Sequence, residues 1–192
     1  MARRPREEVC GAFYHVTARG NCGQTIYGDD QDRGRFLYLL DRVSRRHRWL
    51  CLAYCLMTNH FHLLVQIPDG GLSAGMQQLL SGYSRATNQR YGRRDHLFRQ
   101  HFFSVRLKRH SHLLAASRYI VLNPVRAGLC DSPDRWRWSS HRACAGLEYG
   151  PAFLATGELL AIFAPKPDRA RASYCDFVAA GIATTSDIVT KA

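Results

Sequence analysis

Alternating hydrophobic and polar positions predict four short strands in the first two thirds of the chain. Residues 13–19, 49–57, 60–66 and 102–107 each suit a strand that turns one face toward a core. Hydrophobic residues recur every three or four positions over 30–47, 73–91 and 112–123, which predicts three amphipathic helices. Asp29 or Asp30 suits the N-cap of the first helix and Ser111 that of the third, which we expect Pro124 to end.

This β-α-β-β-α-β-α order predicts the fold class. It suits an α+β fold with a small antiparallel sheet and helices packed mainly on one face, of the ferredoxin-like kind. From about residue 146 the pattern weakens to two short helical pieces, at 158–163 and 174–180, around a linker that contains Pro and Arg. We therefore expect a main domain over residues 1–145 and a short, partly helical C-terminal extension over 146–192.

The charge of the chain points to a nucleic-acid partner. The net charge is +12, and 24 of the 27 basic residues are arginine. A GC-rich genome would explain the preference for arginine over lysine, but it would not explain the net charge. A protein this basic attracts nucleic acid through its phosphates. The chain has no GxxxxGK[ST] phosphate loop, so no nucleotide cofactor is expected.

The remaining composition indicates a cytoplasmic protein without a membrane span. No run of about 18 apolar residues exists, and the first residues are charged rather than signal-like. The seven cysteines include no Cys-x-x-Cys pair, which argues against a disulfide framework. Cys51 and Cys55, at about 13 Å apart along one strand, are too distant to share a zinc ion.

The strongest chemical signal is His60-Phe61-His62. Alternate side chains of a strand share a face, so both imidazoles should project together while Phe61 faces a core. Two imidazoles about 7 Å apart at their Cα atoms can converge on one divalent metal ion. A second pair, His110 and His112, lies in a polar, basic stretch where solvated histidines are the simpler interpretation.

The third helix carries a second group of polar residues. Tyr119 and Asn123 are four residues apart and share one helix face, while Leu113, Ala116 and Ile120 supply the core side. A tyrosine that packs its ring and an asparagine that caps the helix would explain the pattern equally well. Beside a metal site, however, Tyr119 would suit a nucleophile; Tyr83 and Tyr91 are the alternatives.

Five ordered motifs give the chain a clear family resemblance over roughly residues 8–145. They are GAFYHVTARGN (11–21), MTNHFHLLV (57–65), HLFRQHF (96–102), SRYIVLNPVRAGL (117–129) and WRWSS (136–140). The sequence resembles the REP-associated tyrosine transposases, within the IS200-like single-tyrosine HUH transposases. Thr58 stands where that family generally has a proline.

The resemblance implies a function and a set of site residues. His60, His62 and Asn123 would bind Mg²⁺ or Mn²⁺, and Tyr119 would form a 5′-phosphotyrosine link to single-stranded DNA and free a 3′-hydroxyl. Imidazole ligands favour Mn²⁺ over the harder Mg²⁺. The implied activity is that of a metal-dependent endonuclease and strand transferase acting on hairpin-associated DNA.

Basic side chains near these motifs are the candidate DNA contacts. They are Arg19, Arg93, Arg94, Arg99, Arg106, Lys108 and Arg118. We expect single-stranded or hairpin DNA as the partner and a monomer or homodimer as the assembly. Two other classes stay open: a non-catalytic module that binds single-stranded nucleic acid, and a structural protein stabilised by zinc.

Overall fold

The computed structural model describes residues 8–99 and 101–189, the last seven of these as backbone alone. Four antiparallel strands form one sheet: β1 (Phe13–Arg19), β2 (Leu50–Leu56), β3 (His60–Gln66) and β4 (Phe103–Leu107). Their order is β2-β3-β1-β4. Helices α1 (Asp30–His47) and α2 (Leu72–Tyr91) provide the two crossovers, so the predicted ferredoxin-like α+β class is confirmed.

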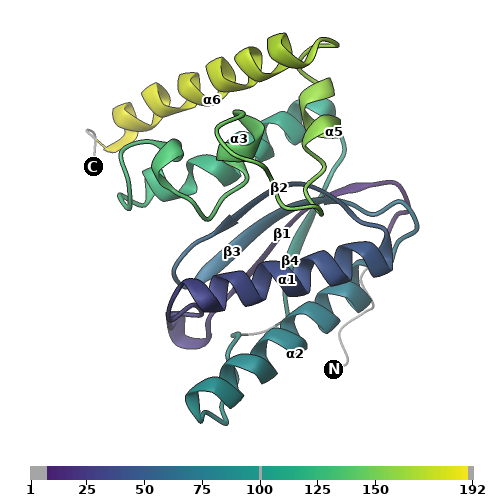
Figure 1. The fold of residues 1–192 in the computed structure, drawn as a ribbon, viewed down its shortest axis with the longest axis vertical. Helices are drawn as coiled ribbons and strands as arrows, with labels where there is room; N and C mark the ends of the chain where they lie inside the picture. The colour runs from purple at the N-terminus through teal and green to yellow at the C-terminus, as the bar shows by residue number, and fades with distance from the viewer. Residues whose placement is uncertain (1–7, 100, 190–192) are drawn as a thin grey trace.

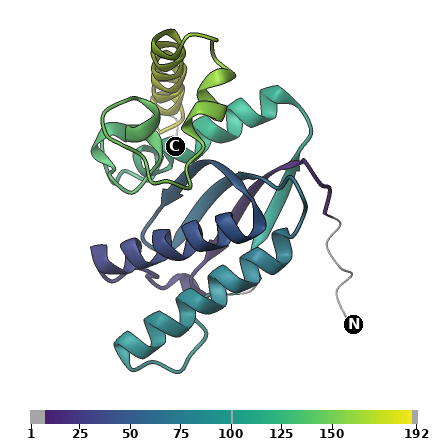
Figure 2. The same cartoon turned by 45° about the vertical axis from the view of Figure 1, so that its right-hand side comes forward.

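Helices cover both faces of this sheet. Figure 1 shows α1 and α2 on one side, and α3 (His110–Arg126), α5 (Thr156–Ala161) and α6 (Pro167–Val189) on the other. The turned view in Figure 2 shows the same sandwich. The prediction that the helices pack mainly on one face holds only for the two crossover helices. The opposite face is also covered, because α3 and the C-terminal helices form a second core on it.

The pleat of β3 explains the two cores. Phe61, Leu63 and Val65 face α1 and α2, whereas Leu64 faces α3 and the C-terminal helices. His60 and His62 share the face of Leu64, as the alternating pattern predicted. The alternation in the sequence also predicted that Phe61 faces a core on the side of the strand opposite the histidines, and it does.

The third helix differs from its predicted bounds. It begins at His110, after the N-cap residue Arg109, so Ser111 lies inside the helix. Pro124 also lies inside it, and the helix continues to Arg126 because the Ala127 N–H still donates to the Asn123 carbonyl at 2.9 Å. Pro124 has no N–H to donate to the Ile120 carbonyl and its ring crowds that carbonyl, but the residues after it keep their own donors.

The C-terminal extension packs closely against the rest of the chain. Leu159 of α5 and Tyr174 and Val178 of α6 are buried with Leu113 and Ile120 of α3. The division after residue 145 remains a prediction. Short segments, η1 (Asn21–Gly23), η2 (Pro133–Arg135) and α4 (His141–Cys144), complete the connections.

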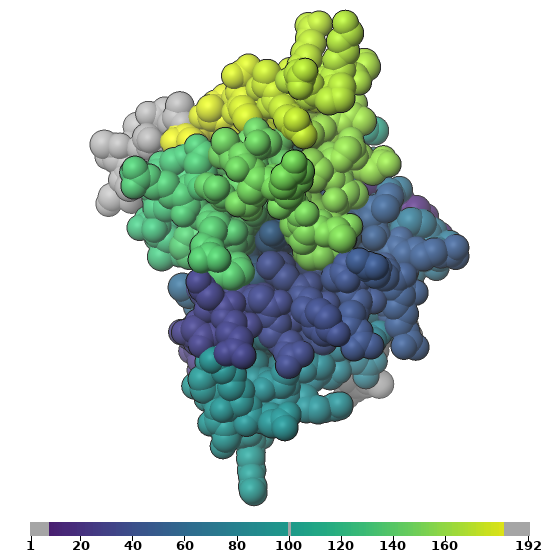
Figure 3. Space-filling view, viewed as in Figure 1, coloured from purple at the N-terminus to yellow at the C-terminus, as the bar shows by residue number. Residues whose placement is uncertain are grey.

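The two layers also meet at one side of the molecule. Arg137, after η2, pairs with Asp30 at the start of α1 at 3.0 Å. In Figure 3 the green segment that follows α3 lies directly against the purple and blue segment that includes α1. None of the helices in the described part of the chain has the length and apolarity that crossing a membrane requires.

Candidate active site

Three histidines and one tyrosine gather on the α3 side of the sheet. The ring centroids of His60 and His62 are 5.0 Å apart, and the Tyr119 ring lies 5.5 Å from that of His62. His15 of β1 completes the group, with its ring 5.1 Å from His62 and 5.9 Å from Tyr119. The predicted histidine pair and the predicted tyrosine therefore meet within a single chain.

The strands fix the position of each histidine. In the antiparallel pairing of β1 with β3, His62 lies opposite Thr17, and His60 lies opposite Arg19. Odd-numbered positions of β1 and even-numbered positions of β3 consequently share one face. This places His15, Thr17 and Arg19 beside the two histidines.

Hydrogen bonds hold both β3 imidazoles by the same ring atom. His60 Nδ1 is 2.8 Å from Asn59 Oδ1, an acceptor, so Nδ1 carries the proton. His62 Nδ1 is 2.9 Å from His15 Nε2. The Nε2 atom of His62 is buried and has no hydrogen-bond partner among the described residues. If His62 donates from Nδ1, both rings present an Nε2 lone pair.

Burial keeps these histidines neutral. It lowers the pKa of His62 to about 3, with smaller contributions from His15 and His60. Burial also lowers the pKa of His15, and burial followed by the charge of Arg19 lowers that of His60. Neutral imidazoles are the form that binds metal ions.

The residues present suit a divalent ion with few protein ligands. Among the described residues no group of three or more His, Cys, Asp or Glu side chains could hold a metal. An amide oxygen falls outside that set, and Asn123 lies one turn beyond Tyr119 on α3. Its Nδ2 donates to the Tyr119 carbonyl at 3.3 Å, so the amide group lies along the helix toward Tyr119.

Tyr119 differs from the two alternative tyrosines. Its side chain is 43% exposed, and the guanidinium of Arg126 lies 5.1 Å from its ring centroid. In contrast, the Tyr83 hydroxyl is buried and donates to the Ile26 carbonyl, and the Tyr91 hydroxyl donates to Asp32. Of the three, only Tyr119 lies beside the histidines.

The candidate DNA-contacting residues lie in different places. Arg19 ends β1 on the site face, and the Arg99 N–H donates to its carbonyl, so these two residues are adjacent. Arg106 is paired with Tyr14, whose side chain faces the α1–α2 core, so it projects from the other face. Arg118 packs over the Phe177 ring of α6 at 4.4 Å. Lys108 is exposed between β4 and α3.

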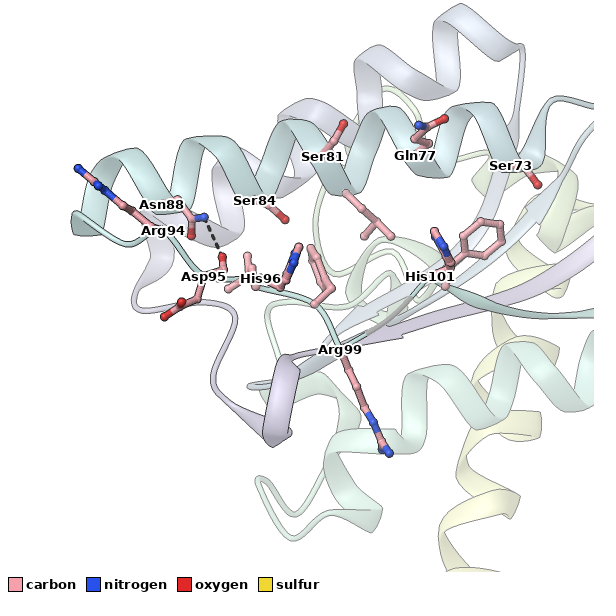
Figure 4. Close-up of a pocket in the computed structure, with 14 residues that line it drawn as sticks. Ser73, Gln77, Ser81, Ser84, Asn88, Arg94, Asp95, His96, Arg99 and His101 are labelled. Carbon is pink, nitrogen blue, oxygen red and sulfur yellow. Dashed lines mark hydrogen bonds between the residues drawn. The ribbon is translucent and has the colours of Figure 1, made fainter. Parts of the chain in front are cut away.

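The other two arginines lie near a separate cavity. Arg93 and Arg94 follow the C-terminus of α2, and Arg94 lines a hollow of about 1040 Å³ between α2 and residues 94–99, 101 and 102. Figure 4 shows serine, glutamine and asparagine side chains of α2 along this hollow, with Arg99 pointing away from that helix. His15, His60, His62 and Tyr119 do not line it, so the candidate active site and this cavity are in different places.

Cys51 and Cys55 cannot form the alternative zinc site. An irregularity in the pairing of β2 with β3 falls between Cys51 and Ala53. As a result Cys51 is buried in the core beneath α1 and α2, and Cys55 in the core beneath α3. The two thiols therefore lie on opposite faces of the sheet.

Sequence reasoning missed three neighbours of the site: His15, Asn59 and Arg126. His15 lay within a recognised motif, but the pattern of one strand gives no register with another. Asn59 directly precedes the histidine pair. It could have been found because a metal-bound histidine usually donates its second ring N–H to a nearby oxygen acceptor. Arg126 is seven residues after Tyr119, two helical turns on, and this spacing was a usable signal.

Comparisons with known proteins agree with this geometry. A family model described as "Transposase IS200 like" matches residues 8–123, more than half of the chain. Among solved structures, one of a REP-associated tyrosine transposase bound to a REP hairpin is similar in fold. Its TM-score is 0.65 at 18% sequence identity, over 78% of this chain and 89% of that chain. A search of curated proteins gave no significant match.

Proposed function

Because this chain belongs to the IS200-like transposase family, we propose that it is a metal-dependent DNA endonuclease and strand transferase that acts through Tyr119. The observation that carries the proposal is the exposed Tyr119 ring 5.5 Å from the His62 ring, beside His60, in one chain. A nucleophile beside a metal-binding pair is the arrangement that phosphoryl transfer requires.

His60, His62 and Asn123 are the proposed metal ligands. The partnerless, buried Nε2 atom of His62 supports this, since a buried nitrogen without a partner is costly unless something binds it. The neutral state of both imidazoles supports it as well. When bound, Mg²⁺ or Mn²⁺ would supply Lewis-acid stabilisation of the charge on a phosphate oxygen.

Tyr119 performs the covalent step. Its phenolic oxygen attacks the phosphorus, and the bond from phosphorus to the 3′-oxygen breaks. Overall, the proton lost by the phenol ends on that oxygen, which leaves as a 3′-hydroxyl. The DNA 5′-end stays on Tyr119 as a phosphotyrosine. The Arg126 guanidinium over the ring favours the negative charge that develops on the phenolic oxygen.

Strand joining is the reverse of this step. A 3′-hydroxyl of another DNA end attacks the phosphotyrosine and releases Tyr119 with its proton. Because the link conserves the phosphodiester, no ATP is needed. His62 and Tyr119 belong to the same chain, so we propose that one copy of the chain holds a complete site.

The proposed substrate is single-stranded DNA next to a hairpin. The net charge of +12 supports a polyanionic partner. Arg19 and Arg99, side by side at the His60 end of β1, are the proposed phosphate contacts nearest the site. The similar solved structure holds a REP hairpin, which supports hairpin DNA for this chain as well.

A covalent-adduct assay tests the proposal. The wild-type protein is incubated with a labelled library of stem-loop oligonucleotides and Mn²⁺, and the products are separated on a denaturing gel. We expect a protein–DNA band from the wild type and from Tyr91→Phe, and none from Tyr119→Phe. His60→Ala and His62→Ala should lose the band together with metal binding.

Two results would count against the proposal. An adduct that persists in Tyr119→Phe would move the nucleophile to another residue. Salt-sensitive DNA binding that ignores EDTA, with no adduct from any variant, would instead favour a non-catalytic nucleic-acid-binding module.

A further inference from the structure

An exposed phenylalanine lies on the same face of the sheet as the histidines. Phe103, in the edge strand β4, exposes 63% of its surface, and Val105 of the same strand exposes 44%. Single exposed hydrophobic residues are common on protein surfaces and mean little alone. The position of Phe103 relative to the site is what gives it a role.

The strand register defines that position. Phe103 lies opposite Thr17 of β1, and Thr17 lies opposite His62 of β3. Residues directly opposite share a face, so Phe103, Thr17 and His62 form one row across the sheet. Two strand spacings separate Phe103 from His62, which is about 10 Å.

The surroundings of this row suit a nucleic-acid strand. Tyr119, 43% exposed, stands next to His62, and the exposed cation Arg19 is on the same face. A strand whose phosphate lies at Tyr119 and which follows this row toward β4 would place a neighbouring nucleotide near Phe103. Every base has a π-face that stacks on an aromatic ring, whatever its identity.

We propose that Phe103 is a stacking platform for a nucleobase of the cleaved strand, next to the phosphate that Tyr119 attacks. This subsite rests on the proposed function, which supplies the position of that phosphate. Its ligand is any nucleobase in a single strand. It holds the strand in place and takes no part in bond breaking.

A double-mutant cycle between protein and DNA tests the subsite. One probe is a fluorescein-labelled stem-loop with thymidine flanks; the other has the same stem-loop and backbone but abasic flanks. Affinities of the wild type and Phe103→Ala are measured by fluorescence anisotropy in EDTA, so no cleavage occurs. We expect Phe103→Ala to weaken binding to the thymidine probe by about 5- to 150-fold, as for other base-stacking side chains, and to change binding to the abasic probe little.

Two further variants serve as controls. Phe103→Trp keeps an aromatic surface and should bind the thymidine probe at least as well as the wild type. Tyr38→Ala removes an aromatic side chain of α1 that is 52% exposed but lies in the opposite layer, and it should affect both probes equally. Circular dichroism checks that each variant is folded.

Equal losses on the two probes, or no loss on either, would overturn the subsite. The result does not depend on chemistry, because the cycle measures binding alone. Failure of the Tyr119 adduct would refute the proposed function, whereas absence of coupling between Phe103 and the bases would refute only the platform.

Discussion

Replacing His15 by phenylalanine should weaken Mn²⁺ binding by about 10- to 100-fold, the usual effect of losing a partner that orients a metal ligand. His15 Nε2 lies 2.9 Å from His62 Nδ1. For His62 to offer its Nε2 lone pair, its Nδ1 must carry the proton, and His15 is the acceptor for that proton. Phenylalanine fills similar space and accepts nothing.

The magnitude agrees with the energy of the lost contact. A buried donor left without an acceptor costs about 1–3 kcal/mol. A 10- to 100-fold change in affinity corresponds to about 1.4–2.7 kcal/mol. Metal binding at Nε2 fixes the His62 proton on Nδ1, where the wild type has His15 as its acceptor and the phenylalanine variant has none.

The measurement is Mn²⁺ titration followed by electron paramagnetic resonance, which reports free Mn²⁺ without any DNA. His15→Gln keeps an acceptor oxygen near the position of Nε2 and should restore most of the affinity. Thr17→Ala changes the residue opposite His62 but no hydrogen bond to it, and it should bind as the wild type does. Equal Mn²⁺ affinity for His15→Phe and the wild type would refute the reasoning about the ring proton.

Three further predictions concern stability and reactivity. Gly75→Ala should destabilise the fold by about 1–3 kcal/mol, because the added Cβ would lie 2.3 Å from Trp49 Cζ2. Gly34→Ala has open space around it and should stabilise α1 by up to about 1 kcal/mol. Urea unfolding measures both changes in the free energy of unfolding. Asp32→Ala should cost about 2–4 kcal/mol, since its buried carboxylate accepts from the Gly28 N–H and the Tyr91 hydroxyl; a thermal melt unchanged from that of the wild type would contradict this. Iodoacetamide should modify the exposed Cys10 and Cys22 of the folded protein and spare the buried Cys51, Cys55 and Cys144, as mass spectrometry can show. Burial raises the pKa of these three thiols, to about 12 for Cys144, and so leaves little reactive thiolate.

The parts of the site within one element were predictable from the sequence. The two-residue period of β3 placed His60 and His62 on one face, and the four-residue spacing on α3 placed Tyr119 and Asn123 together. Both follow from local geometry. Family resemblance then joined the two elements, which periodicity alone could not do.

The parts that depend on contacts between elements were not predictable. The proximity of His15 to His62 depends on the register of β1 with β3. Arg118 was expected at a DNA surface, and only the position of α6 shows that it packs over Phe177. Pro124 was expected to end α3, but a proline in the last turn costs one hydrogen bond, and burial of the helix offsets that loss.

The packing of α6 against α3 has a consequence for how this chain can be shortened or extended. The family match stops at residue 123, yet the helix that carries Tyr119 buries its apolar side against Leu159, Tyr174 and Val178. A protein trimmed to the matched segment would lose these partners, and the tyrosine would lose its fixed position over the sheet. The terminal helices are thus a part of the scaffold that positions Tyr119, and tags or fused domains belong after them rather than in their place.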